Sequence, residues 1–208
     1  LAIQIFKGVY RKKFLHELVS GQTDMDRLDY LRRDCFFTGV IEGSVGSDRI
    51  IGMLNVSGDK LVIDEKGIYS LEKFIIARRL MYWQVYMHKT VLGSESLLLK
   101  VLRRAKEMAE SGVDLYATPA LKFFLNNNIG PADLTGVGLF TPEIVASHFT
   151  RLDDTDIMVS AKYWSDHSDR ILSELSGRLM RRDLLSIELD NEPFAEDRIK
   201  KFRKLAAD

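Results

Sequence analysis

The chain has 208 residues, of which 46% are hydrophobic and 29% are charged, a composition typical of a soluble globular protein with one good core. Thirty basic and thirty acidic residues give a formal net charge of zero, which argues against general electrostatic attraction to nucleic acid. No uninterrupted apolar run approaches about 18 residues, so we expect no membrane partner. The single cysteine, Cys35, excludes an internal disulfide and fits a reducing, cytoplasmic location.

The first part of the chain is predicted to be helical, with one β-hairpin. Apolar residues that recur every four positions predict a helix over residues 2–19. A more highly charged helix is expected over 24–37 and a glycine-bearing loop after it. Two β-favouring runs then flank Ser57-Gly58-Asp59, which predicts a hairpin over about 49–63.

A long helix is expected from about Ser70 to Glu110, and between Phe74 and Leu92 it is apolar almost all round, as a buried helix would be. Beyond it the chain is predicted to form shorter elements. The expected helices begin at Thr118-Pro119 and Thr141-Pro142 and cover 154–164, 168–179 and 194–205, with a possible short strand over 184–189.

These elements make the chain mainly α, with a minor β element. We divide it at Gly112. Residues 1–112 form a helical core that carries the hairpin, and residues 113–208 form a mixed helical accessory region.

The charged helix concentrates polar side chains on one face. Because each helical residue advances about 100°, the positions i, i+4 and i+8 of Asp26, Tyr30 and Asp34 fall within a sector of roughly 80°. Arg33 joins that sector, whereas the opposite side carries Leu28, Leu31 and Cys35. The pattern fits a solvated face of an ordinary amphipathic helix, or a binding site.

A second polar set lies on the long apolar helix, where Arg78, Tyr82, Tyr86 and Lys89 are spaced to share one face. Buried cations need partners, because an unpaired buried charge is costly. The partners are either carboxylates of the protein, including those of the charged helix, or an anionic ligand such as a phosphate chain held by Arg78. The spacing leaves both interpretations open.

The histidines do not indicate a metal site by their spacing. None of the four forms an i, i+4 pair, and the sequence contains no HExxH or CxxC motif. Aspartates over 153–156 and 166–169 gather near His167, where a metal site is conceivable. Helix capping is the favoured interpretation of that cluster.

Two motifs carry a family resemblance. The run over 20–34, Ser-Gly-Gln-Thr-Asp-Met-Asp-Arg-Leu-Asp-Tyr-Leu-Arg-Arg-Asp, resembles the closing motif of HD-domain phosphohydrolases. It is most similar to the deoxynucleoside triphosphate triphosphohydrolase branch, which reads Asp-x-Asp-Lys/Arg-x-Asp-Tyr-x-x-x-Asp. Arg78 followed by Tyr86-Met87-His88-Lys89 is similar to the same branch, with Met87 in place of its usual glutamine. The resemblance covers about 20–89 and implies part of an HD-type helical domain.

The resemblance implies a role for each matched residue. Asp26 matches the aspartate that completes a set of His, His-Asp and Asp ligands around a divalent metal ion, whether Mg, Mn, Fe, Ni or Zn. Arg27 matches a basic residue of the catalytic site near the phosphates, and Arg78 an arginine on the triphosphate. Tyr30, Asp34 and Tyr86 match residues around the deoxyribose, with Asp34 accepting a bond from the 3′-hydroxyl.

The implied activity is hydrolysis of a dNTP to deoxynucleoside and triphosphate. Only His16 precedes Asp26, and the chain contains no His-Asp pair. Since it also begins at Leu1 rather than Met, we expect a C-terminal portion that is inactive alone and works with an upstream HD segment of the same polypeptide. A homo-oligomer is expected. The alternatives are a hydrolase of another phosphate ester and a non-catalytic, nucleotide-responsive interaction module.

Overall fold

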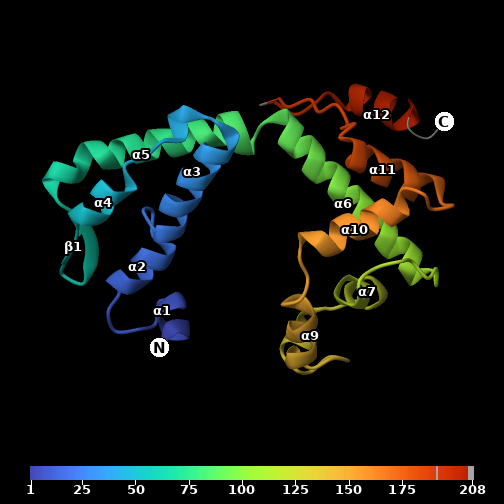
Figure 1. The fold of residues 1–208 in the computed structure, drawn as a ribbon, viewed down its shortest axis with the longest axis horizontal. Helices are drawn as coiled ribbons and strands as arrows, with labels where there is room; N and C mark the ends of the chain where they lie inside the picture. Colours follow the sequence, from blue (N-terminus) through green and yellow to red (C-terminus); the bar gives the residue numbers. More distant parts are fainter. Residues whose placement is uncertain (191, 206–208) are drawn as a thin grey trace. The chain divides into compact units, whose positions relative to one another are not determined.

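The computed structural model describes residues 1–190 and 192–205, and it divides into two compact units, Leu1–His88 and Lys89–Asp208. The chain is mainly α, as predicted, with one two-stranded antiparallel hairpin in the part that the structure describes (Figure 1). The units divide at His88 rather than at the expected Gly112, because the helix that starts at Lys89 packs against a later helix of the second unit.

The first unit comprises short helices, the hairpin and two longer helices. In chain order its elements are α1 (Ala2–Phe6), α2 (Phe14–Ser20), α3 (Met25–Thr38), η1 (Ile41–Gly43), α4 (Ser47–Met53), β1 (Leu54–Ser57), β2 (Lys60–Ile63), η2 (Glu65–Gly67), α5 (Ile68–Met81) and η3 (Tyr82–Tyr86). The prediction of one helix over 2–19 is wrong, because the chain leaves α1 at Gly8, whose φ is +66°, before α2 begins.

Helix α3 forms close to where the sequence predicts it. Asp24 is the N-cap residue, and its carboxylate accepts the backbone N–H of Arg27. The helix ends at Gly39, which takes the left-handed conformation with φ of 72°. Leu28 and Leu31 are buried, so the apolar side of the helix faces the core as expected. Around them the core cluster of this unit is completed by Ile50, Phe74 and Met81.

The hairpin is shorter than predicted. Residues 60–63 form β2 as expected, but most of the first predicted strand forms α4, and only Leu54–Ser57 form β1. Ile50 of α4 is fully buried in the cluster with Leu28 and Leu31, so core packing outweighs the β preference of the local sequence. The turn between the strands has positive φ at Gly58 and Asp59, which is typical of a two-residue hairpin turn.

The long helix predicted from Ser70 to Glu110 is interrupted. Helix α5 ends at Met81, and η3 is a π-helical turn in which the N–H of Met87 donates to the carbonyl of Tyr82. The prediction that this stretch is buried all round is also wrong. Phe74 and Met81 are buried, but Ile75, Ile76 and Trp83 are 59%, 58% and 61% exposed. The cause is that α5 packs on one side only, where it meets α3, α4 and η1.

The second unit is built from helices around a separate core. Its elements are α6 (Lys89–Glu110), α7 (Pro119–Asn126), α8 (Pro131–Leu134), α9 (Pro142–Phe149), α10 (Asp154–Trp164), α11 (Arg170–Arg181) and α12 (Glu196–Leu205). Trp164 is buried at its centre and donates its indole N–H to the carbonyl of Tyr116. Two predicted helices begin at prolines 119 and 142, as expected.

The strand predicted over 184–189 does not form, since these residues have no strand partner in the described part of the chain. The segment instead passes close to α6. A Cβ placed on Gly93 would lie 3.2 Å from the carbonyl oxygen of Leu185, a tighter approach than ordinary van der Waals contact. Among the described residues, no helix combines the length and the apolar character needed to cross a bilayer.

Candidate functional site

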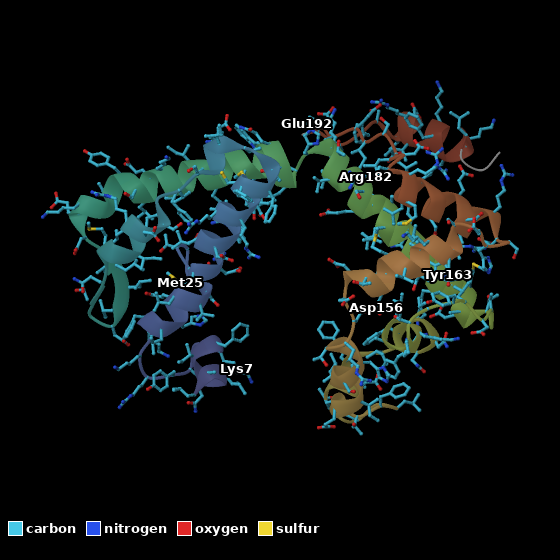
Figure 2. The ribbon with its side chains drawn as sticks, in the orientation of Figure 1. Lys7, Met25, Asp156, Tyr163, Arg182 and Glu192 are labelled. Atoms are coloured by element: carbon cyan, nitrogen blue, oxygen red, sulfur yellow. The ribbon has the colours of Figure 1, made fainter. Side chains whose placement is uncertain are left out.

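The polar face of α3 and the end of α5 line an open cavity of about 380 Å³ within the first unit. Helix α3 begins at Met25, labelled in Figure 2, and the residues on either side of it belong to the cavity wall. The lining consists of Val19, Ser20, Asp24, Asp26, Arg27, Tyr30, Arg78 and Tyr82. Four of the six site residues predicted from the sequence therefore line the same cavity.

Arg27 is fixed at one edge of its guanidinium group. Its Nη1 donates to the Asp24 carboxylate and, at 2.5 Å, to the carbonyl of Gly21. Asp24 is only 3% exposed and also caps the helix, so this carboxylate is fully engaged. In the described part of the chain, Nη2 and Nε of Arg27 have no hydrogen-bond partner.

Arg78 reaches the same cavity from α5. Its guanidinium carbon lies 5.8 Å from the centre of the Tyr82 ring, a cation–π arrangement. No carboxylate pairs with Arg78 among the described residues. Of the two partners that the sequence left open, the structure therefore does not use a protein carboxylate. Lys89 belongs to the second unit, where it begins α6 after the π-turn.

Tyr30 also lines the cavity, close enough to both arginines for their charges to act on its phenol. Burial and the neighbouring Tyr82 phenol raise its pKa, and Arg78 and Arg27 oppose that rise without reversing it. The Tyr30 hydroxyl is consequently protonated at neutral pH. A neutral phenol can donate a hydrogen bond to an anion, which a phenolate cannot do.

Tyr86 and Asp34 adjoin the cavity wall rather than lining it. The Tyr86 hydroxyl donates to Oδ2 of Asp34 over 2.7 Å. Burial raises the pKa of Tyr86, and the Asp34 carboxylate raises it further because it stabilises the protonated phenol. The Tyr86 ring packs edge-on against Tyr30 and Tyr82, with ring centroids 6.0 and 5.1 Å apart, so the pair contacts the cavity wall through the tyrosines.

Two cavity residues were missed as site candidates, and one member of the predicted polar sector lies elsewhere. The sequence pattern predicts no site role for Asp24, although an aspartate at a helix start is a recognised capping signal that marks it. Tyr82 belongs to the polar set predicted on the long helix, which assigns it no role. Arg33 is exposed and pairs with Asp29 at 2.5 Å, so it behaves as part of a solvated helix face.

Among the described residues, Asp26 could serve as one ligand of a metal ion, but they do not supply a complete set of ligands. Asp26 is exposed on the cavity wall and forms no ion pair within the described ranges, so its carboxylate is available. No group of three or more His, Cys, Asp or Glu side chains among those residues could hold a metal ion. Asp26 would need ligands from outside this set.

Two of the aspartates that flank His167 in the sequence, Asp153 and Asp169, are helix caps, as favoured from the sequence, and they cap different helices. Asp153 accepts the N–H groups of Thr155 and Asp156 at the start of α10. Asp169 caps α11 through the N–H of Leu172 and pairs with Arg104 of α6. The backbone N–H of Asp169 also donates to Nδ1 of His167. These contacts give Asp153 and Asp169 structural roles in the second unit.

The chain is similar to an HD-associated protein family and to a phosphohydrolase of known structure. Residues 45–117 match the family described as HD associated region. The fold superposes on the crystal structure of a phosphohydrolase from Bacteroides thetaiotaomicron with a TM-score of 0.91 and 53% identity, over 99% of this chain and 50% of that chain. These matches support an HD-domain-related family.

Two further matches are to proteins described only as uncharacterized or hypothetical. The chain is 32% identical to the uncharacterized protein YwfO of Bacillus subtilis over 181 residues, 87% of this chain and 39% of that protein. A hypothetical protein from Aquifex aeolicus is 30% identical over 86% of this chain and 40% of its own, with a TM-score of 0.54. The chain thus spans half or less of the length of these relatives.

Proposed function

We propose that this chain contributes the phosphate- and sugar-binding side of the active site of a metal-dependent HD-type phosphohydrolase, and that the substrate is a deoxynucleoside triphosphate. The observation that carries the proposal is the cavity in which Arg27 and Arg78 face the same space, with Arg78 unpaired by any carboxylate in the described residues. A half-buried guanidinium without a counter-ion favours a phosphate ligand.

Each wall of the cavity has a part in this proposal. The two guanidinium groups bind phosphate oxygens, and the Tyr30 hydroxyl donates a further hydrogen bond. The deoxyribose lies against the rings of Tyr30 and Tyr86, and Asp34 accepts a bond from its 3′-hydroxyl. Because Tyr86 occupies only one oxygen of Asp34, the other oxygen is free to accept that bond.

The reaction is attack of water on the α-phosphorus. A bond forms between the water oxygen and phosphorus, the bond to the 5′-oxygen breaks, and the 5′-oxygen takes up a proton as triphosphate is released. A divalent metal ion bound by Asp26 and by ligands of the upstream HD segment would polarise that water and the phosphate. Arg27 and Arg78 stabilise the negative charge on the phosphate chain as the bond breaks.

The test is to incubate the full-length protein with Mg²⁺ or Mn²⁺ and each of the four dNTPs, and to separate the products. Release of inorganic triphosphate with deoxynucleoside supports the proposal. Release of phosphate or pyrophosphate indicates a hydrolase of another kind of phosphate ester. No turnover with any of these substrates would contradict the proposed activity and favour a nucleotide-responsive interaction module.

A further inference from the structure

We propose that Asp24 is a positioning residue that holds Arg27 for phosphate binding. The inference deepens the proposed function and rests on it for the nature of the ligand. Nothing in the family resemblance assigns a role to Asp24. Its importance follows from the contacts that it makes at the start of α3.

Asp24 contacts both the backbone and the side chain of Arg27. Oδ1 accepts the Arg27 backbone N–H at 2.8 Å, and Oδ2 pairs with Nη1 of the same residue. A carboxylate that is 3% exposed needs such partners, because burying a charge without them is costly. Asp24 therefore fixes the start of α3, and it also orients the guanidinium group of Arg27, the third residue of that helix.

The carbonyl of Gly21 supplies a second anchor for the same Nη1 atom. Gly21 is itself fixed, since its N–H donates to the carbonyl of Glu17 at 2.8 Å and a Cβ in its place would collide with that carbonyl. The end of α2 and the cap of α3 thus hold one edge of the Arg27 guanidinium from two directions.

The other edge of the Arg27 guanidinium is free. Nη2 and Nε have no hydrogen-bond partner in the described residues, and Arg27 lines the cavity with a side chain that is 28% exposed. A free arginine side chain carries about 2 kcal/mol of rotamer entropy, which is lost when it binds a ligand. Because Asp24 and Gly21 already restrain Arg27, less of that entropy remains to be lost on phosphate binding.

The capping and positioning roles of Asp24 can be separated by Asp24→Ser. Serine caps a helix as well as aspartate does, but its hydroxyl is too short and uncharged to hold the guanidinium. The matched control is Asp153→Ser, which replaces another N-cap aspartate; its carboxylate accepts backbone N–H groups and pairs with no arginine among the described residues. Both variants should retain their melting temperatures within a few degrees of the parent protein.

The measurement is the affinity of the full-length protein for inorganic triphosphate, by calorimetry with Mg²⁺ present, for Asp24→Ser, Arg27→Gln and the double variant. We expect Asp24→Ser to weaken binding about tenfold, since a charge-assisted hydrogen bond stops orienting the ligand donor. If Asp24 acts through Arg27, the double variant binds no more weakly than Arg27→Gln alone. Asp153→Ser should bind as the parent does.

Three results would overturn the inference: unchanged affinity in Asp24→Ser, losses that add in the double variant, or no triphosphate binding by the parent protein. If Asp24→Ser does not fold, Asp24→Asn replaces it, with an expected loss of about threefold because the amide oxygen still accepts a hydrogen bond. Failure of the proposed function is distinguishable. A parent protein that binds triphosphate with the expected coupling but hydrolyses no dNTP contradicts only the proposed reaction.

Discussion

The Tyr86 hydroxyl donates to Oδ2 of Asp34 over 2.7 Å, which joins the π-turn after α5 to the polar face of α3. The two residues are 52 positions apart in the sequence. The widened turn carries the Tyr86 ring against Tyr30 and Tyr82 while Arg78 faces the cavity one turn earlier. π-Turns inside helices occur frequently at functional sites, and this one lies next to the candidate site.

Replacing Tyr86 by Phe tests that connection. The variant keeps the ring contacts but leaves a partly buried Asp34 carboxylate without its donor, so we expect a loss of about 1–2 kcal/mol in the free energy of unfolding. We also expect dNTP binding to weaken a few-fold, because Asp34 is less firmly held. Urea unfolding and a binding titration measure the two effects.

The control is Tyr163→Phe. Tyr163, labelled in Figure 2, stacks on Tyr116 in the second unit, and its hydroxyl has no hydrogen-bond partner in the described chain. That variant should change neither stability nor binding. Equal behaviour of the two tyrosine variants would argue against a role for the Tyr86–Asp34 hydrogen bond.

Asp26→Ala should abolish metal binding and reduce turnover of the full-length protein at least about 100-fold, because the substituted carboxylate is the proposed metal ligand. Asp34→Ala should instead mainly raise the KM for dNTP. The matched control is Asp29→Ala, on the same helix, where the carboxylate is exposed and pairs with Arg33. Metal content, measured by mass spectrometry, and steady-state rates distinguish the three variants. An Asp26→Ala protein with normal metal content and a normal rate would refute the assignment of Asp26 as a metal ligand.

Arg78→Lys should weaken dNTP binding by roughly tenfold, since lysine keeps the charge but loses the planar fork that binds two phosphate oxygens. Its stability should change little, because Arg78 forms no ion pair within the described residues. Arg79→Lys is the control. That neighbour lies over Trp83, with the guanidinium carbon 4.5 Å from the ring centre, and does not line the cavity. Comparable losses in both variants would point to a general charge effect.

The second unit gives a prediction about pH. Arg104 and the backbone N–H of Leu172 lower the pKa of Asp169 from 3.8 to about 2. The unfolded chain therefore takes up a proton at this residue before the folded chain does, so the stabilisation is complete above about pH 5 and is lost as the pH falls from about 4 to 2. Asp169→Asn should cost about 2 kcal/mol at neutral pH.

Urea unfolding of the parent and of Asp169→Asn across this pH range measures the difference between their free energies of unfolding. That difference should fall to zero towards pH 2. A difference that is constant from pH 7 to pH 2.5 would show that the ionised carboxylate is not the source of the stability.

The polar face of α3 follows from the local sequence. Its capping aspartate, its terminal glycine and the periodic leucines are local signals, and they place Asp26, Tyr30 and Asp34 on one side regardless of what surrounds the helix. The same holds for β2 and its turn, and for the helices that begin at prolines 119 and 142.

How these residues come together depends instead on packing between distant segments of the chain. The break at Tyr82–Tyr86 has no proline or glycine to announce it, and α4 forms from β-favouring residues because Ile50 completes the core. The engagement of Arg27 by Asp24 and Gly21, and of Asp34 by Tyr86, depends on side-chain distances that a pattern of residue types does not specify. Local propensities set the faces of the helices, whereas packing between segments far apart in sequence sets which side chains share a cavity.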